Sequence, residues 1–288
     1  MDVHACRCIL RRHSHPLDPQ PTGVEPVLNR LEGIRAVVFD IYGTLIVSAS
    51  GDIGAGGRDG LATAAEAAMR AVGLENPTGA PAVEALNDEI RADHASSRQE
   101  GVEHPEVDIV EIWGRVLARL GICPSEVDTL ALAVHYEART NPTWPMPGLA
   151  EILSRLRERK LLLGIVSNAQ IFTADLFPAL LGETLPALGF NHDLMVYSYR
   201  HGQAKPGRFL YDRVAKALEA REIAPEETLY VGNDMLKDVW PAQQVGFRTA
   251  LFAGDARSYR PRTDDPRVAN VVPDLVLTEL AAVEGCLA

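Results

Sequence analysis

The chain has 288 residues, of which 47% are hydrophobic and 23% are charged, and its formal net charge at pH 7 is −11. This composition is typical of a folded globular protein and argues against disorder over most of the length. The acidic balance, without a long cluster of lysine and arginine, argues against an extended nucleic-acid surface. The longest apolar runs are also far shorter than the roughly 20 residues of a membrane-spanning helix.

Residues 1–33 mix His, Pro, Arg and Gln without a sustained period, which predicts an N-terminal extension that is flexible or packed on the surface. Within it, Val27, Leu28 and Leu31 predict one short helical turn before Gly33. The spacing of its His and Cys residues matches no zinc site. The extension also lacks the continuous apolar segment of a secretory signal, so we expect a cytoplasmic protein with reduced cysteines.

Residues 34–39 (IRAVVF) form a short apolar run rich in β-branched residues, which predicts a buried central strand. Asp40 then stands at the C-terminal end of that strand. Four later segments have apolar residues at helical spacing, and they are 62–72, 82–92, 107–120 and 125–139. The block that follows the first strand is therefore expected to be all-helical.

From residue 147 onward, strand and helix patterns alternate. Strands are expected at 161–166, 194–199, 228–231 and 248–252, helices at 148–159, 171–181, 207–220 and 239–245, and a closing strand-to-helix segment at 275–283. Such alternation predicts an α/β fold with a doubly wound, Rossmann-like parallel sheet covered by helices on both faces. We predict a core at 34–47 and 146–288 and a helical insertion at 48–145, with the Gly- and Ser-rich segment 48–57 as its hinge.

Polar residues stand at the carboxyl ends of the predicted strands, where ligands bind in open α/β sheets. They are Asp40 and Thr44 after the first strand, Ser167 and Asn168 after the second, Lys205 after the third, and Asn233, Asp234 and Asp238 after the fourth. Together they would supply a nucleophile, groups that orient a phosphate and a divalent-metal site. Each signal alone is weak, since a Ser–Asn pair after a strand can simply cap the next helix.

In this order, the motifs FDIYGTL, IVSNAQ, AKPGRFLY and YVGNDMLKD make the chain similar to the haloacid dehalogenase-like superfamily, over about residues 34–285. The resemblance implies that the helical insertion is a cap domain that closes over the site and selects the substrate. Four polar residues near its loops are candidates to face the site, although such residues are more often solvated surface groups, and they are Arg91, His94, Glu106 and Asp108.

By this resemblance Asp40 is the nucleophile, which forms a covalent aspartyl intermediate that water later hydrolyses. Thr44 and Ser167 resemble the hydroxyl donors to phosphoryl oxygens, and Asn168 lies beside them in the catalytic motif. Lys205 resembles the cation that neutralises charge on the nucleophile and the substrate. The implied substrate is a small phosphate ester.

The resemblance also implies a Mg²⁺ site that contains Asp40, the backbone carbonyl of Tyr42 and the last motif. Two spacings of that motif fit the family, Asp234-x3-Asp238 and Asn233-x4-Asp238, and we favour Asp234 as the ligand. Asp238 would bind the metal directly, bind it through water, or orient the lysine instead. Acids this close to the nucleophile would repel its charge unless a cation were present.

One position departs from the family pattern. Most phosphatases of the superfamily carry a second Asp two residues after the nucleophile as general acid and base, but this chain has Tyr42 there. A phenol with an ordinary pKa of about 10 is a poor base at neutral pH, and losing a placed acid or base costs on the order of 10²- to 10⁴-fold. The D-x-Y-G-T pattern, with Lys205 and Tyr211, instead resembles the metal-independent 2-haloacid dehalogenases. The sequence favours a magnesium-dependent phosphatase, and it leaves open a dehalogenase, a weakly active or binding-only member, and the oligomeric state.

Overall fold

The computed structural model describes residues 1–50 and 58–288. Six parallel strands form one sheet in the order β5-β4-β1-β6-β7-β8. They are β1 (Ala36–Phe39), β4 (Leu162–Ser167), β5 (Phe190–Tyr197), β6 (Thr228–Gly232), β7 (Arg248–Phe252) and β8 (Leu275–Leu277). β1 lies at the centre of the sheet, since Phe39 pairs with Ile165 of β4 on one side and with Val231 of β6 on the other.

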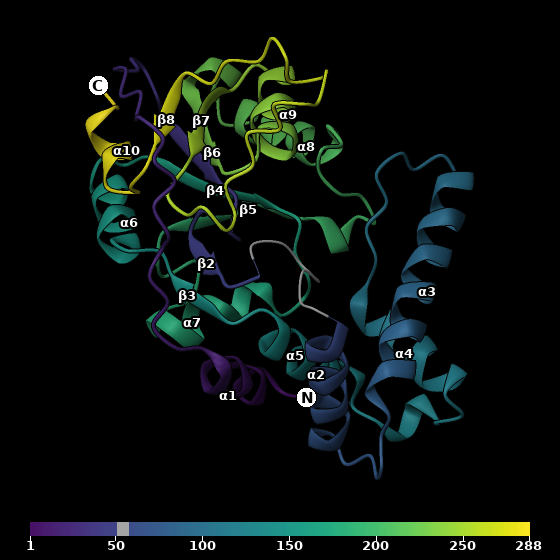
Figure 1. Ribbon diagram of the computed structural model, residues 1–288. Coiled ribbons are helices and arrows are strands. Elements are labelled where there is room, and N and C mark those ends of the chain that lie inside the picture. Colours follow the sequence, from purple (N-terminus) through teal and green to yellow (C-terminus); the bar gives the residue numbers. More distant parts are fainter. Residues whose placement is uncertain (51–57) are drawn as a thin grey trace.

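Helices cover both faces of this sheet, as Figure 1 shows. Val38 of β1 points into a cluster with α8 (Phe209–Glu219) and α9 (Trp240–Gln244). Its neighbour Phe39 points into the larger core on the opposite face, together with α6 (Leu149–Glu158). Successive side chains of a strand alternate between the two faces of the sheet, so a strand that is buried on both faces has a continuous apolar sequence, as β1 does. The predicted doubly wound α/β fold is therefore confirmed.

Among the described residues between β2 (Ile46–Ser48) and β3 (Thr143–Pro145), two short strands that pair antiparallel, the chain forms four α-helices. The helices are α2 (Arg58–Ala71), α3 (Gly79–Gln99), α4 (Ile109–Arg119) and α5 (Thr129–Thr140). Figure 1 shows them gathered to one side of the sheet. The block after the first strand is helical, as predicted, while its limits and its action as a cap stay predictions. Most of the predicted hinge, residues 51–57, lies outside the described residues.

The N-terminal extension contains a helix that the sequence did not predict. Asp2 caps α1 (Val3–His13) by accepting a hydrogen bond from the amide of Ala5 at 2.7 Å. Cys6 and Leu10 on one face of α1 are buried in the main core, and the helix packs on α5 and α7 (Leu176–Leu181). The extension is therefore anchored to the surface, because a short polar helix can still bury a narrow apolar face.

The predicted helical turn at residues 27–31 is wrong. The amide of Val27 donates to the carbonyl of Val276 in β8 at 2.9 Å, and the amide of Leu31 donates to the carbonyl of Cys286 at 2.7 Å. These bonds hold the segment extended along the edge strand, which satisfies backbone groups that a lone helical turn would leave unpaired. Non-local pairing thus outweighed the local helical pattern.

Several element boundaries also differ from the prediction. The strand expected at 194–199 begins earlier, as β5, and the helix expected at 171–181 is a 3₁₀ turn (Thr173–Asp175) followed by α7. A π-helical turn (Met235–Val239) precedes α9, and the closing segment contains β8 and α10 (Ala282–Gly285). Within the described residues, no helix combines the length and the apolar character needed to cross a membrane.

Leu10→Ala should lower the free energy of unfolding by about 2 to 5 kcal/mol, because the leucine is 3% exposed and its removal leaves a cavity between α1 and the core. Val3→Ala on the same helix is the matched control, since Val3 is 55% exposed and should cost less than about 0.5 kcal/mol. Urea unfolding of the three proteins measures both effects. Equal stabilities of the two variants would show that α1 is not anchored through Leu10.

Candidate active site

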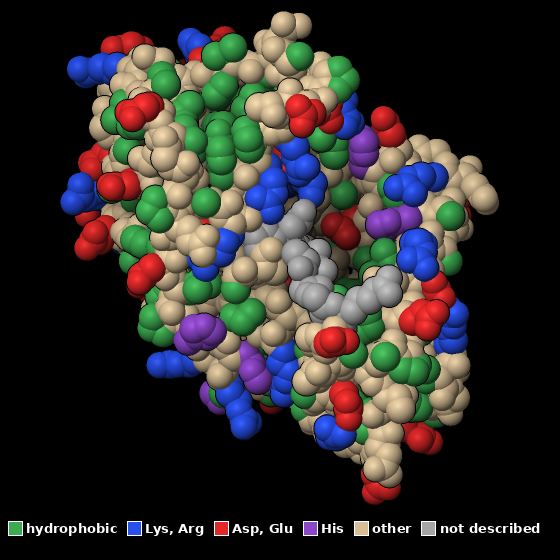
Figure 2. All heavy atoms as spheres, viewed as in Figure 1, with side chains coloured by type: hydrophobic (Ala, Val, Ile, Leu, Met, Phe, Trp, Pro, Cys, Tyr) green, Lys and Arg blue, Asp and Glu red, His purple; other side chains and the backbone are tan. Residues whose placement is uncertain are grey.

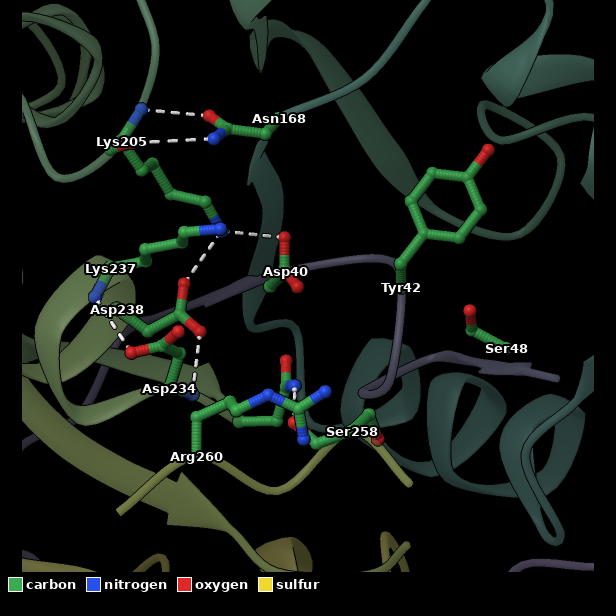
Figure 3. A pocket seen from close by; sticks show the side chains of 11 residues that line it. Asp40, Tyr42, Ser48, Asn168, Lys205, Asp234, Lys237, Asp238, Ser258 and Arg260 are labelled. Carbon is green, nitrogen blue, oxygen red and sulfur yellow. Dashed lines mark hydrogen bonds and ion pairs between the residues drawn. The ribbon is translucent and has the colours of Figure 1, made fainter. Parts of the chain in front are cut away.

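Asp40 lies at the carboxyl end of β1, at the centre of the sheet. Its amide continues the β1–β6 ladder by donating to the carbonyl of Val231 at 2.9 Å, so the backbone of the residue is held by the sheet. The side chain is 6% exposed and turns toward Lys205, whose Nζ lies 2.7 Å from Asp40 Oδ1. The predicted nucleophile and the predicted lysine are thus in direct contact (Figure 3).

Lys205 bridges two buried carboxylates. Its Nζ donates to Asp40 Oδ1 and, at 2.6 Å, to Asp238 Oδ1. Burial by itself would lower the pKa of Lys205, but the charges of Asp238 and Asp40 raise it well above its ordinary value. Lys205 is therefore a permanent cation here. Burial also raises the pKa of Asp238, and the ammonium of Lys205 opposes that effect.

The amide side chain of Asn168 holds Lys205 in place. Asn168 Oδ1 accepts from the backbone amide of Lys205 at 2.7 Å, and Asn168 Nδ2 donates to the Lys205 carbonyl at 3.3 Å. This double contact joins the loop after β4 to the loop that carries the lysine. Asn168 was predicted as a member of the catalytic motif, and the contacts give it a positioning geometry.

Asp238 is held from two further directions. Tyr230 donates its hydroxyl to Asp238 Oδ1 at 3.0 Å, and the amide of Asp234 donates to Asp238 Oδ2 at 2.9 Å. The close approach depends on Gly232, where an added Cβ would lie 2.4 Å from Asp238 Cγ. A side chain at position 232 would therefore displace the carboxylate from Lys205.

Asn233 anchors the turn that follows Asp40 and contains Gly43 and Thr44. Thr44 donates its hydroxyl to Asn233 Oδ1 at 3.3 Å, and Asn233 Nδ2 donates to the carbonyl of Ser258 at 2.6 Å. Gly43 has a φ of 80°, and a Cβ there would lie 2.5 Å from Ser258 Cβ. Glycine is thus required both by the left-handed backbone and by the close packing of Ser258.

Asp234 points to a different partner. Arg262 contacts both of its oxygens, with Nη2 at 2.6 Å and Nε at 3.2 Å from Oδ2, and with Nε at 3.1 Å from Oδ1. Asp234 Oδ1 also accepts from the amides of Leu236 and Lys237. Burial would raise the pKa of Asp234, but Arg262 and these amides lower it overall. Asp234 is therefore an ionised carboxylate bound to an arginine.

The pocket at this edge of the sheet contains most, but not all, of the predicted site residues. Its lining includes Asp40, Tyr42, Asn168, Lys205, Asn233, Asp234 and Asp238. Thr44 and Ser167 are not among its lining residues, since both side chains are fully buried. The Thr44 hydroxyl donates to Asn233 Oδ1, and the Ser167 hydroxyl donates to the carbonyl of Asn168. Their predicted roles as phosphoryl donors stay predictions.

Four lining residues were missed by the sequence analysis, and they are Ser48, Lys237, Ser258 and Arg260. Lys237 immediately precedes Asp238 in the last motif, so its position carried a usable signal. Arg260 lies in an irregular segment after β7, where no motif or period marks it. Figure 2 shows lysine and arginine side chains gathered beside the hollow between the sheet and the inserted helices, which favours an anionic ligand.

Tyr42 lines the pocket but directs its hydroxyl away from Asp40, as Figure 3 shows. The hydroxyl lies 3.2 Å from Thr173 Oγ1. Burial, and to a lesser extent the charge of Glu137, raise the pKa of Tyr42. The phenol therefore stays protonated at neutral pH, which agrees with its predicted weakness as a general base.

Arg91, Glu106 and Asp108 have partners in the protein, whereas the buried Nε2 of His94 has no hydrogen-bond partner among the described residues, and none of the four lines the described pocket. Glu106 accepts a hydrogen bond from Ser198 at 2.7 Å, which ties the inserted helices to the core. Asp108 caps α4 by accepting from the amide of Val110 at 2.9 Å. Arg91 pairs with Asp88 in its own helix.

The residues of the predicted metal site do not fit a metal centre as they lie. Within residues 1–50 and 58–288, no group of three or more His, Cys, Asp or Glu side chains is arranged to hold a metal ion. The chemical reason is visible in the contacts: Lys205 lies between Asp40 and Asp238, and Arg262 holds Asp234. The Mg²⁺ site therefore stays a prediction, and we derive no step through it.

A family model for haloacid dehalogenase-like hydrolases matches residues 34–246, which include β1, the helical insertion and the strands that carry the pocket. The chain belongs to the haloacid dehalogenase-like hydrolases. This confirms the family resemblance and makes the protein a hydrolase.

Curated relatives include phosphatases. A glyceraldehyde 3-phosphate phosphatase of Methanopyrus kandleri is 25% identical over 81% of this chain and 90% of its own length. A phosphoserine phosphatase of Thermus thermophilus is 30% identical over 60% of this chain. The chain spans 62% of that Thermus relative, and 42% of a Schizosaccharomyces pombe hydrolase that is 33% identical over 34% of this chain.

Among solved structures, a defluorinating L-2-haloacid dehalogenase matches with a TM-score of 0.52. It is 18% identical, and the match covers 94% of this chain and 98% of that one. At this identity the likeness supports the fold, and the choice between phosphate and haloacid chemistry has to come from the site itself.

Lys205→Met should destabilise the protein by about 3 to 5 kcal/mol, because it leaves Asp40 and Asp238 as buried like charges without their cation. Lys216→Met is the matched control, since Lys216 is exposed on α8. Chemical unfolding at neutral pH measures the difference. The bridging role is refuted if both variants are as stable as the parent protein.

Proposed function

We propose that this hydrolase is a phosphatase that acts on a small phosphorylated metabolite through an aspartyl-phosphate intermediate on Asp40. The observation that carries the proposal is the buried contact of Asp40 with Lys205, placed at the carboxyl edge of the sheet and beside the cations Lys237 and Arg260. A dianionic phosphate group is complementary to such a pocket. The phosphatase relatives point to the same substrate class.

The geometry leaves one oxygen of the nucleophile available. Asp40 Oδ1 is bound to Lys205, and within the described residues Oδ2 has no hydrogen bond or ion pair. In the proposed reaction an oxygen of Asp40 attacks phosphorus and a new P–O bond forms, while the ester P–O bond breaks and the leaving alkoxide takes a proton from solvent water. Water then attacks the aspartyl phosphate, which releases phosphate and restores the carboxylate.

The cations act mainly through electrostatics. Lys205 is fixed beside Asp40 before any substrate arrives, so it can stabilise charge without reorganisation during the reaction. Lys237 and Arg260 line the same pocket and attract the anionic substrate. We expect the inserted helices to select the rest of the substrate, as a cap domain would.

A second candidate is hydrolytic dehalogenation of a 2-haloacid, which is favoured specifically by Tyr42. A halide leaves with its electron pair and needs no proton, so a protonated tyrosine in place of an acid/base does not hinder that reaction. Here an oxygen of Asp40 would attack the halogen-bearing carbon, and water would hydrolyse the resulting ester. The substrate's carboxylate would meet the same cationic lining.

Asp40→Asn should reduce turnover of p-nitrophenyl phosphate to the background rate, because a neutral amide cannot act as the nucleophile. Asp212→Asn, at an exposed position on α8, is the control and should keep the parent activity. Phosphate release and chloride release from 2-chloropropionate are measured in parallel. Chloride release without phosphate release would replace the phosphatase proposal with the dehalogenase.

Tyr42→Phe should leave phosphatase activity within about tenfold of the parent, well short of the 10²- to 10⁴-fold cost of losing an acid/base, because the hydroxyl points to Thr173. The comparison uses p-nitrophenyl phosphate and glycerol 2-phosphate, whose leaving groups differ in their need for a proton. A loss confined to the glycerol ester would instead identify the Tyr42 hydroxyl as the proton donor.

A further inference from the structure

Asp234, the favoured metal ligand of the last motif, has both carboxylate oxygens engaged by the protein. Arg262 donates from Nε to Oδ1 and from Nη2 and Nε to Oδ2, and Oδ1 also accepts from two backbone amides of the following turn. Asp234 is 5% exposed, and the Arg262 side chain is about one-third exposed. A two-armed arginine contact on a buried carboxylate is among the stronger polar interactions in proteins.

The other oxygens of the predicted metal site are also committed. Asp238 Oδ1 accepts from Lys205 and Tyr230, and Asp238 Oδ2 accepts from the amide of Asp234. The amide oxygen of Asn233 accepts from Thr44. Of the four side chains proposed for the metal, Asp40 alone keeps an oxygen without a partner among the described residues.

The backbone of the segment after β7 places Arg262 for this contact. The amide of Met235 donates to the carbonyl of Arg260 at 2.9 Å, and the amide of Arg260 donates to the carbonyl of Asn233 at 2.9 Å. Arg262 itself has a φ of 51°, a left-handed conformation that is unfavourable for a non-glycine residue. The ion pair with Asp234 helps to offset this cost. The backbone bonds of Arg260 and the ion pair together therefore hold Arg262 beside Asp234.

Magnesium requires near-octahedral oxygen ligands at about 2.0 to 2.1 Å and gives up its hydration reluctantly. To bind Asp234, it would have to displace a guanidinium already seated on both oxygens. Lys205 and Arg262 also cancel two of the three negative charges of Asp40, Asp234 and Asp238, so the net attraction for a divalent cation is small.

We propose that Arg262 is a built-in cation that takes the place of a divalent metal on Asp234, so that this protein binds Mg²⁺ weakly while Arg262 is present. The consequence for turnover rests on the proposed function: the phosphatase reaction would run without Mg²⁺, with Lys205 and the pocket cations supplying the positive charge. The metal-binding part of the proposal does not depend on which reaction the site performs.

The test is a Mn²⁺ titration of the whole protein, with free Mn²⁺ followed by electron paramagnetic resonance. Arg262→Gln should bind Mn²⁺ at least about tenfold more tightly than the parent, because it frees the Asp234 carboxylate. The control Arg267→Gln breaks an exposed ion pair with Asp265 in the same segment and should bind like the parent. Asp234→Asn combined with Arg262→Gln should return the affinity to the parent level.

Equal Mn²⁺ affinity in the parent and in Arg262→Gln overturns the proposal, whether both bind or neither does. If the glutamine variant does not fold, Arg262→Met carries the test, because methionine keeps an unbranched side chain but removes both the charge and the hydrogen bonds to Asp234. Tighter binding by that variant than by the parent supports the proposal, and unchanged binding overturns it. Phosphatase assays with and without chelator are run separately, so a parent protein without any phosphatase activity would refute the proposed function and leave the Mn²⁺ comparison valid.

Discussion

The site depends on one buried ammonium shared by two carboxylates, Lys205 between Asp40 and Asp238. Each of these charges alone would cost several kcal/mol to bury, so the arrangement persists only while all three stay together. Neighbouring side chains hold the three charged residues in position. Asn168 accepts from the backbone amide of Lys205, and Tyr230 donates to the carboxylate of Asp238. Asp40, the proposed nucleophile, and Lys205 are therefore held by the same network of contacts at the carboxyl edge of the sheet.

Lys205 offsets one of the two negative charges of Asp40 and Asp238, and Asp234 adds another negative charge nearby. Further cations lie close to these carboxylates. Arg262 binds Asp234, and Lys237 and Arg260 line the pocket in front of the nucleophile. Such fixed positive charges are already oriented when an anionic ligand enters, which is the condition under which electrostatic stabilisation is most effective. The lining is therefore electrostatically complementary to an anion, on which both the phosphatase proposal and the dehalogenase alternative depend.

Tyr42 connects this site to the rest of the molecule. On one side it lines the pocket that contains Asp40, and on the other it borders a small cavity formed with α1, α5 and α7. Its hydroxyl is held by Thr173 at the start of the turn that leads into α7. Tyr42 and Leu10 of the N-terminal helix therefore line one small cavity, on the side of Tyr42 that faces away from Asp40.

The sequence by itself determined the alternation of strands and helices, the helical insertion and the polar residues at the strand ends, because these depend on local periodicity and on short motifs. It therefore predicted that Asp40, Lys205 and Asp238 would meet. Tertiary structure alone decided the course of the N-terminal segment, the neighbours of Tyr42 and the partner of Asp234. Arg260 and Arg262 come from an irregular segment far along the chain, and their contacts arise from backbone bonds to the turn at Asn233 and Met235 that no local pattern encodes.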